Sequence, residues 1–167
     1  YNIVDWMISL WPKIECVDGE EWADEVISFN QELKKNGDPV DTERSDSTKA
    51  LGEAERDDTV NFVSLGFGGE LVLKFDNFIE NRLGNDIEVV ETSYGNPACN
   101  AYPETVRVYA SQNGIDWEDL GNACLDGTFD LDLGSLNWAQ YIKLVDESDP
   151  SQFSGNTDGY DIDGVRA

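Results

Sequence analysis

Hydrophobic residues recur at every second position in most segments between the turns. In residues 70–75 the apolar side chains Leu71, Leu73 and Phe75 lie two apart, and residues 105–111 repeat the pattern. A period of two places successive side chains on opposite faces of a β-strand, so one face of these strands is expected to be buried. Strands are predicted over residues 25–30, 61–65, 70–75, 87–91, 105–111, 116–120, 129–133, 138–145 and 158–167, and residues 138–145 are expected to be buried on both faces.

Turn-forming residues separate the predicted strands. Asn113-Gly114 is a strong signal for a β-hairpin. The glycine-rich residues 66–69 predict another hairpin turn rather than a phosphate-binding loop, because a strand follows them and no Lys-Ser/Thr pair does. Short strands at regular spacing with turns between them predict an all-β fold, an antiparallel β-sandwich that forms one domain over residues 25–167.

Residues 1–24 differ from the rest of the chain. Residues 1–11 are almost continuously apolar, and Pro12 then ends any regular element. An exposed segment of this kind would be a sticky patch. It is therefore expected either to pack locally or to insert as a donated strand into a neighbouring subunit. We interpret residues 1–24 as an N-terminal extension and residues 1–19 as a candidate surface for self-association.

The composition excludes several functional classes. The chain has 35 acidic and 11 basic residues and a formal net charge of -24, so it should repel nucleic acid and anionic membranes. No run approaches the ~18 apolar residues that a membrane span needs, so no membrane insertion is expected. The absence of histidine removes the Ser-His-Asp and Cys-His catalytic groups and the commonest zinc ligand. Chance pairs of carboxylates are too abundant to indicate a glycosidase, and we expect no enzymatic activity.

The predicted closing strand, residues 158–167, combines apolar residues with carboxylates. Ile162 and Val165 are expected in the core. The neighbouring aspartates cannot be buried alone, because an isolated carboxylate costs several kcal/mol to remove from water. A bound Ca²⁺ is the leading hypothesis, since this ion takes carboxylate and carbonyl oxygens. The alternative is a solvated acidic face. The candidate ligands are Asp86, Glu91, Asp146, Asp149, Asp158, Asp161 and Asp163.

The chain has three cysteines. Cys99 and Cys124 both fall in predicted loops, so a disulfide between them is expected. Cys16 is then left either as a thiol or bonded to another chain. The alternative is three reduced, buried thiols. A disulfide implies an oxidising compartment.

The order of several motifs resembles a known superfamily. VRVYASQNGIDWEDLG (106–121) is followed by WAQYIKLVD (138–146) and by IDGVRA (162–167). This order is similar to that of the galactose-binding-like, or discoidin-like, jelly roll. The segments KALG (49–52) and FVSLGFGGELVLKF (62–75) further resemble a domain of large secreted bacterial surface proteins. The resemblance implies a jelly-roll β-sandwich that is secreted, stabilised by calcium and not an enzyme, and that often binds carbohydrate.

Carbohydrate recognition uses aromatic rings and planar polar side chains held in loops. For each such residue the alternative is ordinary packing, and Trp117 and Trp138 are expected to be structural. The acidic surface favours neutral or cationic sugars, or anionic sugars bridged by calcium. The candidate ligand-binding residues are Tyr94, Asn96, Asn100, Tyr102, Phe153, Asn156 and Tyr160.

Together these features predict a secreted, calcium-stabilised module at the cell surface that serves adhesion or binds a glycan. The alternative is a structural subunit of an extracellular filament, assembled through the apolar N-terminal segment.

Overall fold

The computed structural model describes residues 21–56, 60–92 and 98–167. In this part of the chain antiparallel strands form two sheets that pack as a β-sandwich, so the predicted all-β class is confirmed. The strands are β1 (Glu25–Asn30), β2 (Val63–Ser64), β3 (Glu70–Glu80), β4 (Ile87–Glu91), β5 (Thr105–Ser111), β6 (Glu118–Cys124), β7 (Gly127–Phe129), β8 (Trp138–Asp146) and β9 (Asp161–Arg166). Short 3₁₀ segments are η2 (Thr42–Arg44), η3 (Ser47–Ala50), η4 (Leu131–Gly134) and η5 (Pro150–Gln152).

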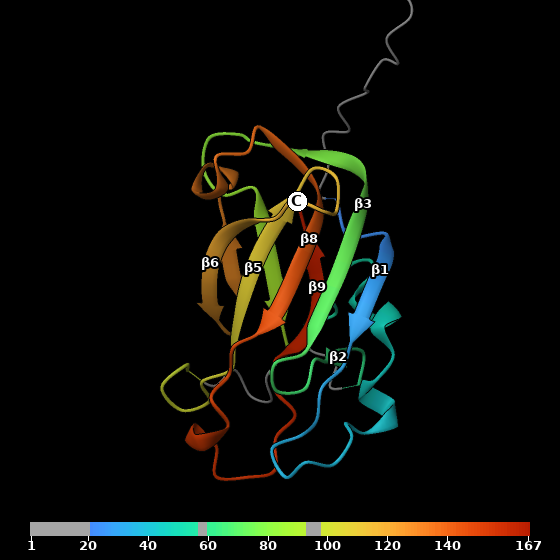
Figure 1. Cartoon of the computed structure of the whole chain (residues 1–167), viewed down its shortest axis with the longest axis vertical. Coiled ribbons are helices and arrows are strands. Elements are labelled where there is room, and N and C mark those ends of the chain that lie inside the picture. The colour runs from blue at the N-terminus through green and yellow to red at the C-terminus, as the bar shows by residue number, and fades with distance from the viewer. Residues whose placement is uncertain (1–20, 57–59, 93–97) are drawn as a thin grey trace, which may run out of the picture.

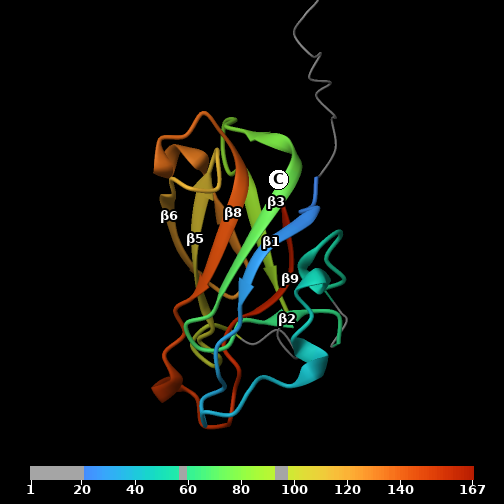
Figure 2. The same cartoon turned by 45° about the vertical axis from the view of Figure 1, so that its right-hand side comes forward.

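The two sheets differ in size. One has five strands in the order β1-β3-β8-β5-β6, and the other has four in the order β2-β9-β4-β7. Figure 1 shows the five-stranded sheet in front and β9 behind it. Turning the molecule by 45° again places β2 and β9 behind β1 and β3 (Figure 2). The closing strand β9 therefore has a neighbour on each side, and only Arg166 of its residues is not buried.

The core lies between the two sheets. Alternate residues of the central strands point into it, such as Leu71 and Leu73 of β3 and Ile142 and Leu144 of β8. Val165 and Ile162 meet them from β9, as the sequence predicts. Burial of a large aliphatic side chain stabilises a fold by about 1.5–3 kcal/mol, so this layer is the main source of stability.

The predicted strand over residues 129–133 is wrong beyond Phe129. β7 ends there, and Leu131–Gly134 form η4. The Asp130 carboxylate accepts a hydrogen bond from the Asp132 N–H at 2.8 Å and caps this turn. Leu131 is buried, but Leu133 is 64% exposed. An aspartate that bonds to its own backbone competes with strand pairing, and the alternating pattern did not reveal this.

The turn at residues 66–69 joins the two sheets, and the predicted hairpin is wrong. β2 belongs to the four-stranded sheet and β3 to the five-stranded one. The chain crosses at a point of close backbone approach, where a Cβ on Gly66 would lie 2.2 Å from the Glu32 carbonyl oxygen. Gly66 also has a φ of +73°, so a side chain there would be strained as well as crowded. By contrast, the hairpin predicted at Asn113-Gly114 is confirmed, since it joins the paired strands β5 and β6.

Strand β8 is buried on one face only, which corrects the prediction for residues 138–145. Ala139, Ile142 and Leu144 are buried, whereas Tyr141 and Lys143 are half-buried on the outer face. Within the described residues no second layer packs on that outer face (Figure 1).

Residues 21–24, which the sequence analysis placed in the N-terminal extension, lie on the sandwich. Trp22 forms a bridge with Arg166, and the Ala23 N–H donates to the Val165 carbonyl at 2.9 Å. The proposed self-association segment, residues 1–19, and Cys16 lie outside the described residues. No helix in the described ranges is long and apolar enough to cross a membrane.

Candidate functional site at the loop end

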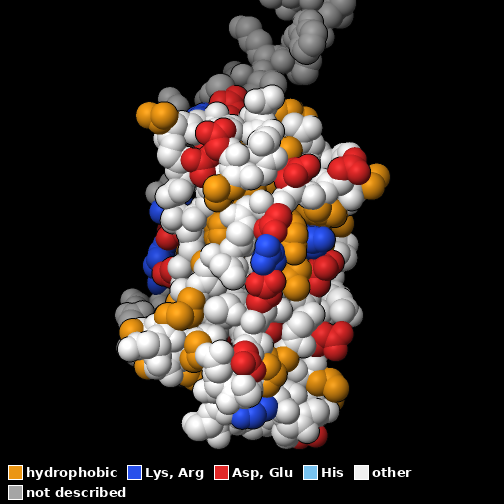
Figure 3. Space-filling model, turned by 60° about the vertical axis from the view of Figure 1, so that its left-hand side comes forward, with side chains coloured by type: hydrophobic (Ala, Val, Ile, Leu, Met, Phe, Trp, Pro, Cys, Tyr) orange, Lys and Arg blue, Asp and Glu red, His pale blue; other side chains and the backbone are white. Residues whose placement is uncertain are grey.

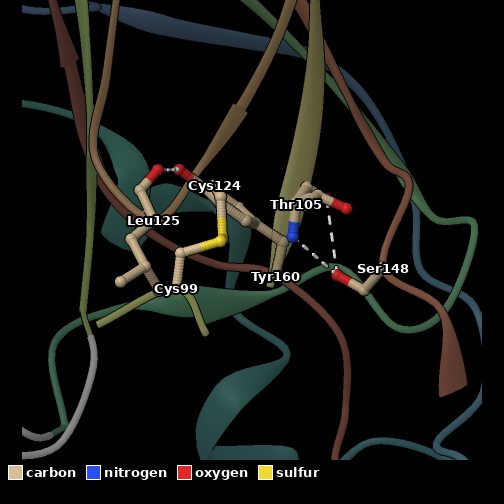
Figure 4. Close-up of a disulfide and its surroundings, with 6 residues drawn as sticks. All are labelled: Cys99, Thr105, Cys124, Leu125, Ser148 and Tyr160. Carbon is tan, nitrogen blue, oxygen red and sulfur yellow. Dashed lines mark hydrogen bonds between the residues drawn. A yellow bond between two sulfur atoms is a disulfide. The ribbon is translucent and has the colours of Figure 1, made fainter. Parts of the chain in front are cut away.

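Several long connections gather at one end of the sandwich, where β1, β4, β6 and β8 end. We call this the loop end, and it includes residues 31–47, 65–69, 98–104 and 147–160. The predicted disulfide between Cys99 and Cys124 is confirmed and ties residues 98–104 to the end of β6 (Figure 4). The cross-link holds the loop that carries Tyr102 and Glu104.

Hydrogen bonds fix the same loops from the other side. The Tyr160 hydroxyl donates to the Leu125 carbonyl at 2.7 Å, next to the disulfide (Figure 4). The Thr105 N–H donates to Ser148 Oγ at 3.0 Å. Three separate connections are thereby held together, so side chains at this end are preorganised.

Arg44 is the cation at the centre of the loop end. Its Nη1 lies 3.0 Å from both carboxylate oxygens of Asp158 and 3.7 Å from Asp161 Oδ2. Its guanidinium carbon lies 4.8 Å from the centroid of the Phe62 ring. The side chain remains 27% exposed. A planar donor is thus held between a carboxylate and an aromatic ring, with part of its surface open to solvent.

Two glutamates extend this cluster into the interior. Burial, together with the Asp161 and Glu91 carboxylates, raises the pKa of Glu104 to about 11. Glu104 therefore keeps its proton at neutral pH and hydrogen-bonds to Glu91. Burial and the nearby Asp158 also raise the pKa of Asp161 well above its ordinary value, although the Ser64 hydroxyl donates to this carboxylate. Protons as well as Arg44 thus limit the negative charge here.

Replacing Glu104 by Gln tests the retained proton. The folded pKa of Glu104 is raised, so the folded state binds a proton that the unfolded state releases above about pH 4.3. Stability should therefore fall as pH rises above that value. Glu104→Gln mimics the protonated acid, so we expect a melting temperature above that of the wild type at pH 8 and near it at pH 4.5. Equal melting temperatures at both pH values would contradict a retained proton.

Aromatic side chains cover the outside of the cluster. The Tyr102 ring is half-buried, and its centroid lies 5.2 Å from that of Phe153 in an edge-on contact. Phe153 in turn contacts Phe67 at 5.9 Å. Burial, followed by the Glu104 carboxyl, raises the pKa of the Tyr102 hydroxyl, while Arg44 lowers it. Tyr102 therefore lies near the acidic cluster that Arg44 neutralises.

The predicted ligand-binding residues divide into three groups. Tyr94 and Asn96 lie outside the described residues. Phe153 is buried, and Tyr160 is fully buried in the core, so these rings are packed inside. Asn100, Tyr102 and Asn156 lie at the surface of the loop end. The Asn156 Oδ1 accepts a hydrogen bond from the Asn36 N–H at 3.1 Å and links two of the loops.

The predicted metal ligands do not form one set. Glu91, Asp158 and Asp161 come together with Glu104 and Arg44, as described above. Asp146 lies at the same end, where it accepts from the Gly68 and Tyr160 N–H groups at 2.9 Å each. Asp149 is exposed and caps η5, Asp86 is at the opposite end, and Asp163 faces residues 54–56.

These carboxylates do not fit a calcium ion as they are arranged. Asp86 accepts from the Arg82 and Leu131 N–H groups at 2.8 and 3.0 Å, and Asp163 accepts from the Glu55 and Arg56 N–H groups at 3.2 and 2.7 Å. Across residues 21–56, 60–92 and 98–167, no group of three or more Asp, Glu, Cys or His is placed to hold a metal ion. Backbone donors pair with Asp86 and Asp163, and Arg44 pairs with Asp158. The calcium hypothesis stays a prediction.

Thermal melting with and without a chelator tests calcium directly. Because backbone N–H groups pair with Asp86, Asp146 and Asp163, and Arg44 pairs with Asp158, we expect the melting temperature to be the same in 2 mM CaCl₂ and in EGTA, as ~2 mM exceeds sensor-type dissociation constants. A clear fall in EGTA that CaCl₂ reverses would restore the calcium site.

The sequence analysis missed Arg44, Glu104 and Ser64. Ser64 is in a buried strand, and Glu104 is one of many acidic residues, so neither stands out. Arg44 could have been found by asking which of the few basic residues could reach the closing strand.

Comparisons with known proteins find similar structures but no matching family. No protein-family model matches the chain, and no curated protein matches it. The C-terminal domain of a chitobiase from Bacteroides fragilis aligns over 87% of this chain and 91% of its own, with 19% identity and a TM-score of 0.53. The likeness shows the fold alone. It is consistent with the predicted antiparallel β-sandwich. A GH31 CBM32-2 structure bound to GalNAc aligns over 85% of this chain and 97% of its own, with 14% identity and a TM-score of 0.40.

Proposed function

We propose that this protein is a non-catalytic carbohydrate-binding module whose ligand contacts the loop end. The observation that carries the proposal is the half-buried Tyr102 ring, which the disulfide-held loop places at the surface of the loop end. Its ring and hydroxyl are suited to contact a sugar, and the Arg44–Asp158 ion pair fixes the neighbouring acidic cluster. The similar fold of the chitobiase domain fits the proposal but does not carry it.

The charge of the site limits the class of sugar. Asp158 and Asp161 contact Arg44, and Glu91 and Glu104 lie behind them, so acidic groups outnumber the arginine even though Glu104 keeps its proton. The field at this end therefore opposes carboxylated or sulfated sugars. Neutral glycans, or sugars with an amino group, suit it better.

The disulfide supports a location outside the cell. Cys99–Cys124 would persist in an oxidising environment and would be reduced in most cytosols. We therefore propose an extracellular module, which would serve adhesion or hold an enzyme near its polysaccharide. Calcium is not required by this proposal.

A glycan array followed by calorimetry tests the site. We expect the wild type to bind neutral or amino sugars and Tyr102→Ala to weaken this binding by about tenfold or more, as for the loss of an aromatic anchor. The matched control is Phe78→Ala, which removes a 45% exposed ring at the opposite end of β3.

The control should bind as the wild type does. An array with no neutral or amino-sugar ligand, or a Tyr102→Ala variant with full affinity, would contradict a glycan site at the loop end.

A further inference from the structure

The outer face of the five-stranded sheet carries a second group of aromatic and basic side chains. Lys143 of β8 lies at its centre, with its Nζ 4.7 Å from the Tyr109 ring centroid and 4.8 Å from that of Trp117. Tyr141 is two residues away on β8 and is also half-buried. In Figure 3, basic, hydrophobic and acidic side chains lie next to one another in the middle of the surface on the β5 and β6 side. We call Tyr109, Trp117, Tyr141 and Lys143 the lysine–aromatic face.

Strand register explains this arrangement. Tyr109 of β5 lies directly opposite Lys143 of β8, so their side chains share the outer face. Trp117 comes just before β6, the neighbour of β5 on the other side. Strand register therefore holds Tyr109 beside Lys143, and the connection from β5 to β6 brings Trp117 to the same ammonium group.

The charge of Lys143 is not matched by the protein. Within residues 21–56, 60–92 and 98–167, it is the one basic side chain that has neither a carboxylate nor a carbonyl oxygen as a partner. The nearby carboxylates are already paired. Glu25 lies 3.2 Å from Lys74 Nζ, and Asp119 lies 3.0 Å from Arg107 Nε. In a chain with 35 acidic and 11 basic residues, a lysine without an anionic partner is unexpected.

We propose that the lysine–aromatic face binds an acidic polysaccharide, a chain of uronic acid residues. The sugar rings lie against the outer surfaces of the aromatic side chains, and a sugar carboxylate pairs with the Lys143 ammonium. This ligand supplies the anion that the protein does not. The site goes beyond the proposed function, because it differs from the loop end in both place and charge.

Much of the net charge of -24 lies away from the lysine–aromatic face and acts on a polyanion only at a distance. Exposed charges more than about 8 Å apart are largely screened at physiological ionic strength. Two carboxylates on strands beside the face, those of Glu25 and Asp119, are engaged by Lys74 and Arg107. A polymer also presents the same group repeatedly, which raises the apparent affinity of a weak single contact.

Affinity electrophoresis in gels that contain polygalacturonate tests the proposal. Fully methyl-esterified polygalacturonate is the matched probe, because it keeps the sugar rings and lacks the charge. We expect the wild type to be retarded by the acidic polymer, less so in 0.5 M NaCl, and not by the ester. Lys143→Met should weaken this retardation by about tenfold, because it keeps the aliphatic stem and removes the cation.

Two control variants separate charge from folding. Lys143→Arg keeps a cation over the rings, and Lys74→Met removes a cation of the same face that is paired with Glu25. Both should be retarded as the wild type is. Circular dichroism melting shows that each variant is folded at the temperature of the gel.

The results of this experiment can be told apart from those of the glycan-binding test at the loop end. Retardation by polygalacturonate that survives in Tyr102→Ala supports a separate acidic site, whatever the glycan array shows for neutral sugars. The proposal is overturned if polygalacturonate does not retard the wild-type protein. It is also overturned if the methyl ester retards the protein as strongly as the acidic polymer does. Full binding by folded Lys143→Met, or loss of binding in Tyr102→Ala alone, also overturns it.

Discussion

Replacing Arg44 by Met is expected to destabilise the protein by about 2–4 kcal/mol. Removing one partner of a buried ion pair typically costs about 3–5 kcal/mol, and the 27% exposure of Arg44 reduces this cost. In a protein of this size each kcal/mol lowers the melting temperature by about 2–4 °C. Differential scanning calorimetry at pH 7 should therefore show a fall of roughly 10 °C.

The pH dependence identifies the cause. Arg44 lowers the pKa of the Asp161 carboxyl, so without Arg44 this carboxyl should hold its proton more tightly in the folded state. The difference from the wild type should therefore shrink as pH falls from 7 to 4.5. The double variant Arg44→Met/Asp158→Asn, which also removes the main partner, should recover part of the loss.

Arg82→Met is the matched control, because Arg82 pairs with Glu80 in an exposed position and should cost less than about 1 kcal/mol. An Arg44→Met variant that melts with the wild type, or a deficit that does not change with pH, would contradict the role of Arg44 as counter-ion.

Removing the disulfide should have an effect of similar size. Cys99 and Cys124 are separated by 25 positions, and a cross-link over such a loop stabilises a fold by ~3–4 kcal/mol in the chain-entropy model. We expect Cys99→Ala/Cys124→Ala to lower the melting temperature by roughly 10 °C. Glycan binding at the loop end should weaken as well, because Tyr102 lies in the loop that the disulfide holds.

Reduction provides an internal check on the same result. With Cys16→Ser in both backgrounds, dithiothreitol should lower the melting temperature of the disulfide-containing protein to that of the double alanine variant. It should leave the variant unchanged. A reduced protein that melts like the oxidised one would show that the cross-link adds no stability.

The strands could be predicted from the sequence because their signal is local. Residue type, turn signals and, for residues 105–111, alternation predicted strands 25–30, 87–91 and 105–111 with the bounds that the structure shows. The signal failed where side chains bond to the backbone, as at Asp130, because a hydrophobic pattern does not record such bonds. The disulfide could also be predicted, because a chain with three cysteines allows few pairings.

The neutralisation of the buried carboxylates could not be predicted in the same way. The sequence argument counted only side-chain cations and calcium as partners. In the structure Asp163 and Asp146 are satisfied largely by backbone N–H groups from distant loops. Arg44 reaches Asp158 across 114 positions. Such contacts depend on how the loops cross, and no local spacing encodes them.

The pairing of Glu21 with Ala167 has a practical consequence. These residues exchange two backbone hydrogen bonds, at 3.3 and 2.8 Å, so the chain enters and leaves this part of the sandwich at one corner. That corner is remote from the loop end (Figure 1). A tag or biosensor tether fused ahead of residue 21 or after residue 167 would project away from Tyr102, and an immobilised sample would present its glycan site outward.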